Sequence, residues 1–380
     1  MLLPKVFYGT FFGAAVFLFP YLAIYYQEIG LSGSQMGMLM GIPAVVSMFG
    51  SPLWGALADA TRRHKLLLCL ALCGMTLTIL GISAVRSFTW LLPLVILYAF
   101  FTSPVMALAD NSVMERLGPR KHEYGKVRMW GAVGWGLMAP IAGSVINRSG
   151  LIWGFYGFAI GLLINLVVVL LMSVVSSQLG KPFWLSLSSF SNRRWAQLLG
   201  LAFVGGLCMS ILNNYLFLHL SGLGANETLM GFSLTLSTIS EFIVFFFADR
   251  LIKRWKARPM LVTALFLFAL RTLAYSFSVA PWQVLALQLL HGVTFSLMWS
   301  AGVAYVNEIA PPGLGATAQG LFSGVMYGLG GGSGSYIGGL LYDSAGTVGM
   351  FRFTGLVSLL VLVLLLIVVR RREFIGVTQA

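Results

Sequence analysis

Long apolar runs separated by short polar stretches cover almost the whole chain. An α-helix needs about 20 apolar residues to cross a bilayer core about 30 Å thick, and every run is at least that long. The pattern therefore predicts twelve transmembrane helices, at residues 6–26, 35–58, 66–85, 88–112, 127–147, 151–176, 197–220, 228–248, 259–279, 282–306, 314–341 and 349–369.

The composition supports an all-α polytopic membrane protein. Hydrophobic residues make up 58% of the 380 residues and charged residues only 9%, whereas a soluble domain has about 25% charged residues. Because so few charges cannot cover a water-facing surface, most of the surface must face lipid. The net charge of +13 reflects only 11 acidic residues, and the 24 bases fall mainly between the apolar runs. This distribution argues against a nucleic-acid partner.

The basic residues also predict the orientation. Nineteen of the 24 Lys and Arg residues lie on one side of the predicted helices, and only Arg86, Arg148 and Arg352 lie on the other. The positive-inside rule assigns the richer side to the cytoplasm. Both termini are then cytoplasmic, and the compact loops favour a bacterial cell inner membrane.

A repeat divides the chain into two parts. Gly55 to Asp59 leads into a basic run after the second predicted helix, and Ala248-Asp249-Arg250 leads into another after the eighth. The two aspartates are half a chain apart. We predict two six-helix halves of the same orientation, at 1–180 and 197–380, joined by a cytoplasmic linker at 181–196. The substrate site of such a protein is expected at the midplane between the halves.

The two acidic-basic loops resemble the signature of the major facilitator superfamily. Arg62 replaces the glycine before the basic pair, and Phe245 replaces the leading glycine of the second copy. The resemblance implies the major facilitator fold, with two pseudo-symmetric halves. It also implies gating roles for a set of residues near helix ends, namely Gly55, Asp59, Arg63, Asp249, Arg250, Gly37 and Gly231.

A second stretch narrows the resemblance. Residues 124–135 resemble the start of helix 5 in the lactose permease group, whose relatives carry phenylpropionate or nucleosides with protons. The similarity implies that Asp110, Trp135, Arg271 and His291 match functional positions of that group. There are departures: Gln288, His291 and Thr294 stand where lactose permease has Lys, His and Glu, and Tyr327 replaces a lysine. Lactose is therefore not the expected substrate.

Four charged residues fall inside predicted helices: Asp110, Arg128, Glu241 and Arg271. A charge at the bilayer centre costs about 2.5–3.5 kcal/mol, so such residues are paired or face a wet cavity. Glu241 is our first choice for the proton acceptor, because burial favours its neutral form and a nearby Arg its charged form. Asp110 and His291 remain alternatives, and structural roles for Arg271 and His291 stay open.

Arg128 and Trp135 are seven residues apart and share one helix face. Together they can grip a hydroxylated ring, by hydrogen bonds from the guanidinium and by stacking on the indole. We expect Asp110, Arg128, Trp135, Glu241, Arg271 and His291 to line one central cavity. The full set of predicted substrate-binding residues is Asp110, Asn111, Arg128, Trp135, Arg271, His291, Gln288 and Tyr327.

These features predict a secondary active transporter that works by alternating access. We expect proton-coupled symport of a small polar organic solute, with a sugar or other hydroxylated ring as first choice. Alternatives are an aromatic acid or nucleoside carrier and an exporter of drugs or lipids. We find no His-Glu-x-x-His, no P-loop and no zinc or redox cysteine spacing, so we expect no enzyme activity, cofactor or metal. The expected partners are the solute, a proton and membrane lipid, and the expected state is a monomer.

Overall fold

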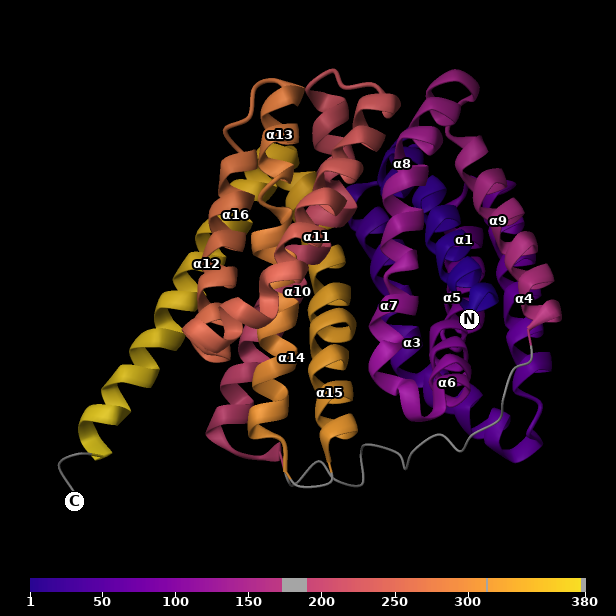
Figure 1. The fold of residues 1–380 in the computed structure, drawn as a ribbon. Helices are drawn as coiled ribbons and strands as arrows, with labels where there is room; N and C mark the ends of the chain where they lie inside the picture. Colours follow the sequence, from indigo (N-terminus) through magenta and orange to yellow (C-terminus); the bar gives the residue numbers. More distant parts are fainter. Residues whose placement is uncertain (173–189, 312–313, 377–380) are drawn as a thin grey trace.

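The computed structural model describes residues 1–172, 190–311 and 314–376 (Figure 1). Regular structure in these ranges is helical. The first group of helices is α1 (Leu2–Leu18), η1 (Phe19–Tyr21), α2 (Leu22–Glu28), α3 (Gly33–Thr61), α4 (His64–Ser83), α5 (Phe88–Thr102), α6 (Val105–Leu117), η2 (Gly118–Glu123), α7 (Tyr124–Arg128), α8 (Trp130–Ser149) and α9 (Ile152–Leu171). The second group is α10 (Arg193–Gly222), α11 (Glu227–Trp255), α12 (Ala257–Tyr275), α13 (Pro281–Gln288), η4 (Gly292–Ser296), α14 (Leu297–Ile309), α15 (Gly315–Ser323), η5 (Gly324–Gly330) and α16 (Gly331–Gly376).

The described residues form 11 continuous helical stretches that are long and apolar enough to cross a membrane. The last stretch, Thr317–Leu364, contains two of the predicted helices. Gly346 separates them, because its φ of 62° lies outside the helical range. The prediction of twelve membrane-spanning helices is therefore confirmed. Residues 181–189 of the predicted linker lie outside the described residues. Helix α10 begins at Arg193, inside the segment predicted as linker.

Two helix groups stand side by side, α1 to α9 and α10 to α16 (Figure 1). We call them the N-half and the C-half. Helix α1 packs on α8 and α9 in the N-half, and α10 packs on α12 and α16 in the C-half. Large apolar side chains also cover the outside, where Leu77 is 71% and Phe246 is 75% exposed. Apolar surface of this kind is what a lipid-facing helix requires.

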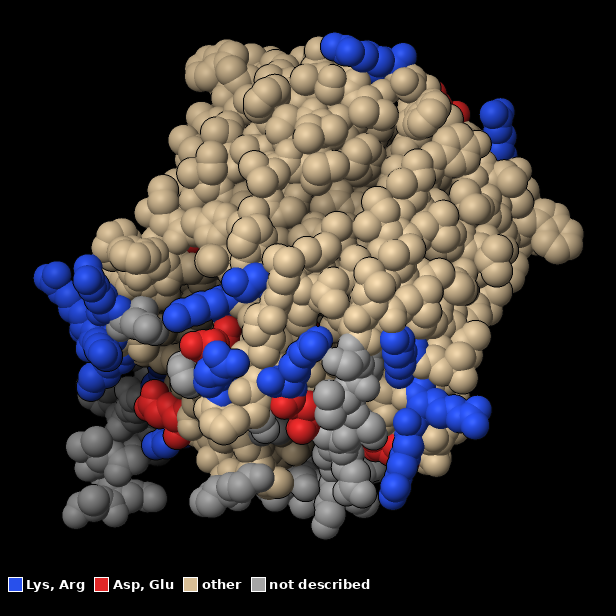
Figure 2. Space-filling view, turned by 45° about the vertical axis from the view of Figure 1, so that its right-hand side comes forward, with Lys and Arg blue, Asp and Glu red and all other residues tan. Residues whose placement is uncertain are grey.

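Charged side chains gather at one end of the molecule. Figure 2 shows Lys and Arg concentrated around its lower edge, with few at the opposite end. We call the lower edge the basic end. Helix α3 ends and α10 begins at this end (Figure 1), and Arg62 and Arg63 follow α3 while Arg193 starts α10. Arg86, which follows α4, lies at the opposite end.

The two halves touch closely at the opposite end through glycines. On α3, Gly33 and Gly37 lie one turn apart and face α16. A Cβ atom on Gly37 would lie 2.5 Å from the Ser335 carbonyl oxygen. On α11, a Cβ atom on Gly231 would collide with the Ala139 carbonyl oxygen of α8. Both predicted gating glycines therefore stand where backbones of the two halves cross without room for a side chain.

Packing is looser towards the basic end. A Cβ atom built on Gly320 or Gly324 would meet no atom within 4 Å. A gating role for Gly55 would bring α3 close to the helix predicted at 314–341 at this end. In the described residues, α3 instead packs against η5 and α16, which form the part of that helix farther from the basic end. The gating role of Gly55 stays a prediction for another conformation.

An acid of the C-half caps a helix of the N-half at the opposite end. The Asp343 carboxylate on α16 accepts hydrogen bonds from the backbone N–H groups of Gly33, at 2.5 Å, and Ser34, at 2.7 Å. These donors lie in the first turn of α3, where backbone N–H groups have no partner within the helix. Helix α3 is therefore held to α16 by a charge-assisted cap between the halves.

Replacing Asp343 by Ala should loosen this end. Loss of a helix cap costs about 1 kcal/mol, so we expect about a fivefold rise in the population that is open at the opposite end. The measurement is a spin-label distance distribution between Ser87→Cys and Val279→Cys in a background without the native cysteines. Ser344→Ala is the control, because the Ser344 hydroxyl donates to the Leu341 carbonyl of its own helix. An unchanged distribution in Asp343→Ala would show that the cap does not hold the halves together.

Candidate functional site

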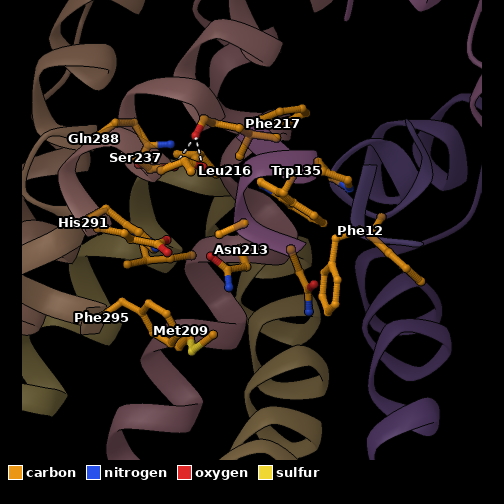
Figure 3. Close-up of a pocket in the computed structure, with 18 of the residues that line it drawn as sticks. Phe12, Trp135, Met209, Asn213, Leu216, Phe217, Ser237, Gln288, His291 and Phe295 are labelled. Carbon is orange, nitrogen blue, oxygen red and sulfur yellow. Dashed lines mark hydrogen bonds and ion pairs between the residues drawn. The ribbon is translucent and has the colours of Figure 1, made fainter. Parts of the chain in front are cut away.

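A cavity of about 500 Å³ lies between the halves (Figure 3). Phe12 and Trp135 of the N-half stand on one side, and Gln288 and His291 of the C-half stand on the other. Asn213 of α10 lies between them. Seven of the predicted substrate and proton residues line this cavity, namely Arg128, Trp135, Glu241, Arg271, Gln288, His291 and Tyr327.

Asp110 and Asn111, both on α6, are not among the lining residues. The expectation that Asp110 lines the cavity is wrong, because its carboxylate is turned towards the Tyr8 hydroxyl, which donates a hydrogen bond to it. Its Oδ1 also lies 4.0 Å from Nε of Arg128. Asp110 therefore meets the cavity only through Arg128.

Aromatic rings fix the position of Arg128. Its guanidinium carbon lies 4.4 Å from the ring centre of Phe12 and 5.0 Å from that of Tyr8. Cation–π contacts of this kind hold a guanidinium in place and leave its N–H donors free to bind other groups. Neither Tyr8 nor Phe12 was predicted as a site residue, because an aromatic residue in an apolar run is usually a lipid-facing or core residue.

The C-half wall of the cavity carries a chain of three ionisable side chains. Nη1 of Arg271 lies 2.8 Å from Nδ1 of His291. Nε2 of the same ring lies 2.8 Å from Oε1 of Glu241. Glu241 therefore contacts His291 directly, and His291 stands between the acid and Arg271.

The protonation of His291 in this arrangement follows from the donors available. A guanidinium has N–H donors and no acceptor, so Nδ1 of His291 must accept from Arg271. The ring proton then sits on Nε2 and is donated to Glu241. In this arrangement Arg271 donates to His291, and His291 donates to Glu241.

Arg271 is 3% exposed and is surrounded by neutral oxygen acceptors. Its Nε and Nη2 donate to the Tyr275 hydroxyl at 3.0 and 2.8 Å. Nη1 also donates to the Thr294 hydroxyl at 3.0 Å, and Nη2 donates to the Gln288 side-chain oxygen. Tyr275 was missed in the sequence, although it lies one helical turn from Arg271 and could have been found by that spacing.

A glycine at a helix crossing allows Arg271, His291 and Glu241 to come together. A Cβ atom on Gly292 would collide with the Ser240 carbonyl oxygen of α11, and the Gly292 N–H donates to the Ser240 hydroxyl at 2.9 Å. Ser240 precedes Glu241, and Gly292 follows His291, so this backbone contact brings acid and imidazole together. The π-helical segment η4 begins at Gly292. Such segments are frequent at functional sites because they re-aim side chains.

The remaining predicted gating residues lie near the basic end. Asp59 Oδ1 is 3.7 Å from Nε2 of His64, and Arg63 is the exposed residue before α4. Arg250 is exposed on α11, with its guanidinium carbon 5.7 Å from the centre of the Phe247 ring. The side chain of Asp249 lies outside the described part of the chain. Their gating roles stay predictions.

Replacing Gly292 by Val should separate Glu241 from His291, because the new side chain would collide with the α11 backbone. We expect transport to fall at least tenfold. The measurement is solute uptake by cells at matched surface expression. Gly320→Val is the control, because a Cβ atom there meets nothing within 4 Å. Equal uptake by the two variants would show that this packing contact does not support the site.

A helical membrane protein in two halves, with buried charges around a cavity between them, has the architecture of a secondary transporter. The model of the "MFS_1 like family" matches residues 2–353. The chain therefore belongs to this branch of the major facilitator superfamily, and it is a multi-pass membrane protein that carries small organic solutes.

Several known transporters are similar over most of the chain. "Maltose permease" of Geobacillus stearothermophilus is 29% identical, over 97% of this chain and 94% of its own length. "Probable 3-phenylpropionic acid transporter" of Escherichia coli (strain K12) is 24% identical, over 79% of this chain and 80% of its own length. The crystal structure of the nucleoside transporter NupG matches with a TM-score of 0.82 at 16% identity, over 96% of this chain and 98% of that one. This last match confirms the fold.

Proposed function

We propose that the protein couples inward proton movement to the uptake of a hydroxylated, ring-shaped solute. The observation that carries the proposal is the joint wall of the cavity, with Arg128 and Trp135 on the N-half and the chain of Arg271, His291 and Glu241 on the C-half. A solute between them touches both halves. Alternating access needs this, because the solute must be released when the halves rearrange.

The coupling follows from the hydrogen-bond roles in the chain. A proton added to His291 places N–H on Nδ1, and that donor then faces the Nη1 donor of Arg271. The contact of 2.8 Å cannot persist between two donors. A proton added to Glu241 removes the negative charge that accepts from His291. In either case proton binding releases Arg271 or His291 to bind the solute.

The N-half supplies side chains that can bind a ring-shaped solute. Trp135 offers an indole face for stacking on a sugar or another ring, and Arg128 offers donors on the same helical face. Asn213 of α10, in the C-half, adds an amide between the two walls. The name of the maltose permease relative also supports a hydroxylated ring.

The orientation, the membrane and the oligomeric state are also part of the proposal. The basic end faces the cytoplasm of a bacterial cell, the protein lies in the inner membrane with both termini inside, and it acts as a monomer. The positive-inside rule supports this orientation, because Lys and Arg gather at that end. With the opposite end closed by glycine crossings, the structure then represents an inward-facing conformation. Gly55, Asp59, Arg63, Asp249 and Arg250 would close the basic end in the other state.

A second candidate is an aromatic acid. Arg128 has a side chain 34% exposed and lies on the cavity wall, where it could bind a carboxylate while Trp135 stacks on the ring. The name of the phenylpropionic acid relative supports this candidate. A thermal-shift screen of sugars, nucleosides and aromatic acids separates the two, because any ligand that binds the native state stabilises it by RT ln(1 + [L]/Kd).

Replacing Glu241 by Gln mimics an acid that is permanently protonated. We expect counterflow, the exchange of labelled for unlabelled solute at equal pH, to stay within about threefold of wild type. Uphill uptake driven by a pH gradient should fail, because a site fixed in one protonation state cannot use the gradient. Both are measured in proteoliposomes with the best solute from the screen.

Ser237→Ala is the control, because Ser237 also lines the cavity on α11 but carries no ionisable group. Uphill uptake at the wild-type rate in Glu241→Gln would contradict the proposed coupling. Loss of counterflow as well would assign Glu241 a role in holding His291 and Arg271, and would move the coupling proton to His291 or Asp110.

A further inference from the structure

A second cavity, of about 140 Å³, lies inside the N-half. It is formed by α1, η1, α2, α3, α4 and α5, and Asn214 of the C-half closes one side. Its walls are mainly aliphatic and aromatic, with Leu39 1%, Ile79 2% and Val95 3% exposed. These buried side chains place the cavity in the protein interior and away from lipid. We call it the side pocket.

The side pocket adjoins the central cavity. Phe19 and Asn214 line both of them. Phe19 begins η1, where the α-helical turn ends and Pro20 follows, so a break in the first helix places this ring between the two spaces. Its ring centre lies 5.4 Å from that of Phe158 and 6.5 Å from that of Tyr98. One solute could therefore extend past Phe19 from the polar space into the apolar one.

The size and chemistry of the side pocket fit one ring. An apolar protein cavity of about 150 Å³ accommodates benzene. Nine of the twelve lining residues are apolar, and the three polar ones are Tyr26, Tyr98 and Asn214. The walls therefore favour an apolar group over water.

One polar side chain in the wall points to a ligand. Tyr98 is 4% exposed and lines the side pocket. Its hydroxyl has the Thr102 side chain as a neighbour but makes no hydrogen bond of normal geometry within the described chain. Buried hydroxyls are nearly always hydrogen-bonded, so one without a partner needs an explanation. A polar substituent at the far end of a bound ring would satisfy it.

We propose that the transported solute has two parts: a hydroxylated ring held in the central cavity, and an apolar group the size of a phenyl ring held in the side pocket. An aryl glycoside has this chemistry. The inference rests on the proposed function, because it assumes that a hydroxylated ring occupies the central cavity. It adds a specificity site that none of the charged residues supplies.

The test compares two probes on the purified protein, the methyl and the phenyl β-glycosides of the same sugar, each with glucose and with galactose. Burying a phenyl ring should make the phenyl glycoside bind about tenfold tighter than the methyl glycoside. Val95→Phe fills the side pocket. It should abolish this preference while methyl glycoside binding stays within about twofold of wild type, which also shows that the variant folds. Ile79→Phe, on a different helix, makes the same test if Val95→Phe does not fold.

The hydroxyl is tested with Tyr98→Phe, which keeps the volume of the side pocket. Binding of the 4-hydroxyphenyl glycoside should weaken severalfold, and binding of the phenyl glycoside should not change. If both hydroxyphenyl and phenyl glycosides bind Tyr98→Phe as they bind wild type, the hydroxyl has no part in the site.

The outcomes separate the two proposals. Equal binding of methyl and phenyl glycosides in wild type, or a phenyl preference that persists in both pocket-filling variants, overturns the side-pocket inference and leaves the proposed function standing. If neither glycoside binds, the hydroxylated-ring function fails, and this inference fails with it.

Discussion

The cost of a buried cation constrains the rest of this structure. Arg271 sits near the C-terminal end of α12, a membrane-spanning helix, at 3% exposure, and an unpaired charge buried there is expensive. Its five N–H donors meet Tyr275, Gln288, Thr294 and His291. The acid Glu241 contacts the other side of the His291 imidazole ring. The charge is thus solvated mainly by neutral oxygens, and its compensation by Glu241 passes through a group that can bind a proton.

Close backbone packing is the condition for that arrangement. The alignment of Arg271, His291 and Glu241 depends on the contact between Gly292 and the carbonyl of Ser240. The closure of the opposite end depends on similar backbone contacts at Gly37 and Gly231. In a membrane there is little hydrophobic force between helices, and association relies on packing and hydrogen bonds. Glycines at crossings allow both, because they bring polar backbone groups within reach of each other. The same feature that stabilises the closed end also places the ionisable groups.

The two halves contribute different chemistry to the cavity. In the C-half, Arg271 is buried and fully engaged by its own neighbours. In the N-half, Arg128 is about one third exposed, rests on Phe12 and Tyr8, and has its carboxylate partner Asp110 at 4.0 Å. A loosely held cation is available to a solute, whereas a tightly held one is suited to respond to protonation. This asymmetry arises although the halves repeat the same helix order.

Much of the fold and part of the site follow from the sequence alone. Twelve apolar runs predict the helices because a bilayer demands a fixed length of apolar chain. The predicted boundary between the last two helices contains Gly346, where the backbone of one continuous helical stretch is non-helical. Seven predicted site residues line the cavity, because a charged or polar side chain inside a membrane-spanning helix is paired or faces a water-filled cavity. Contacts between helices were decided by the tertiary structure. Spacing along one helix cannot say that Glu241 meets His291 before Arg271, that Asp110 turns to Tyr8, or that Asp343 caps α3 from the other half. Those pairings depend on the rotation and approach of helices far apart in the chain, which glycine contacts, proline breaks and π-helical segments set only once the helices are packed.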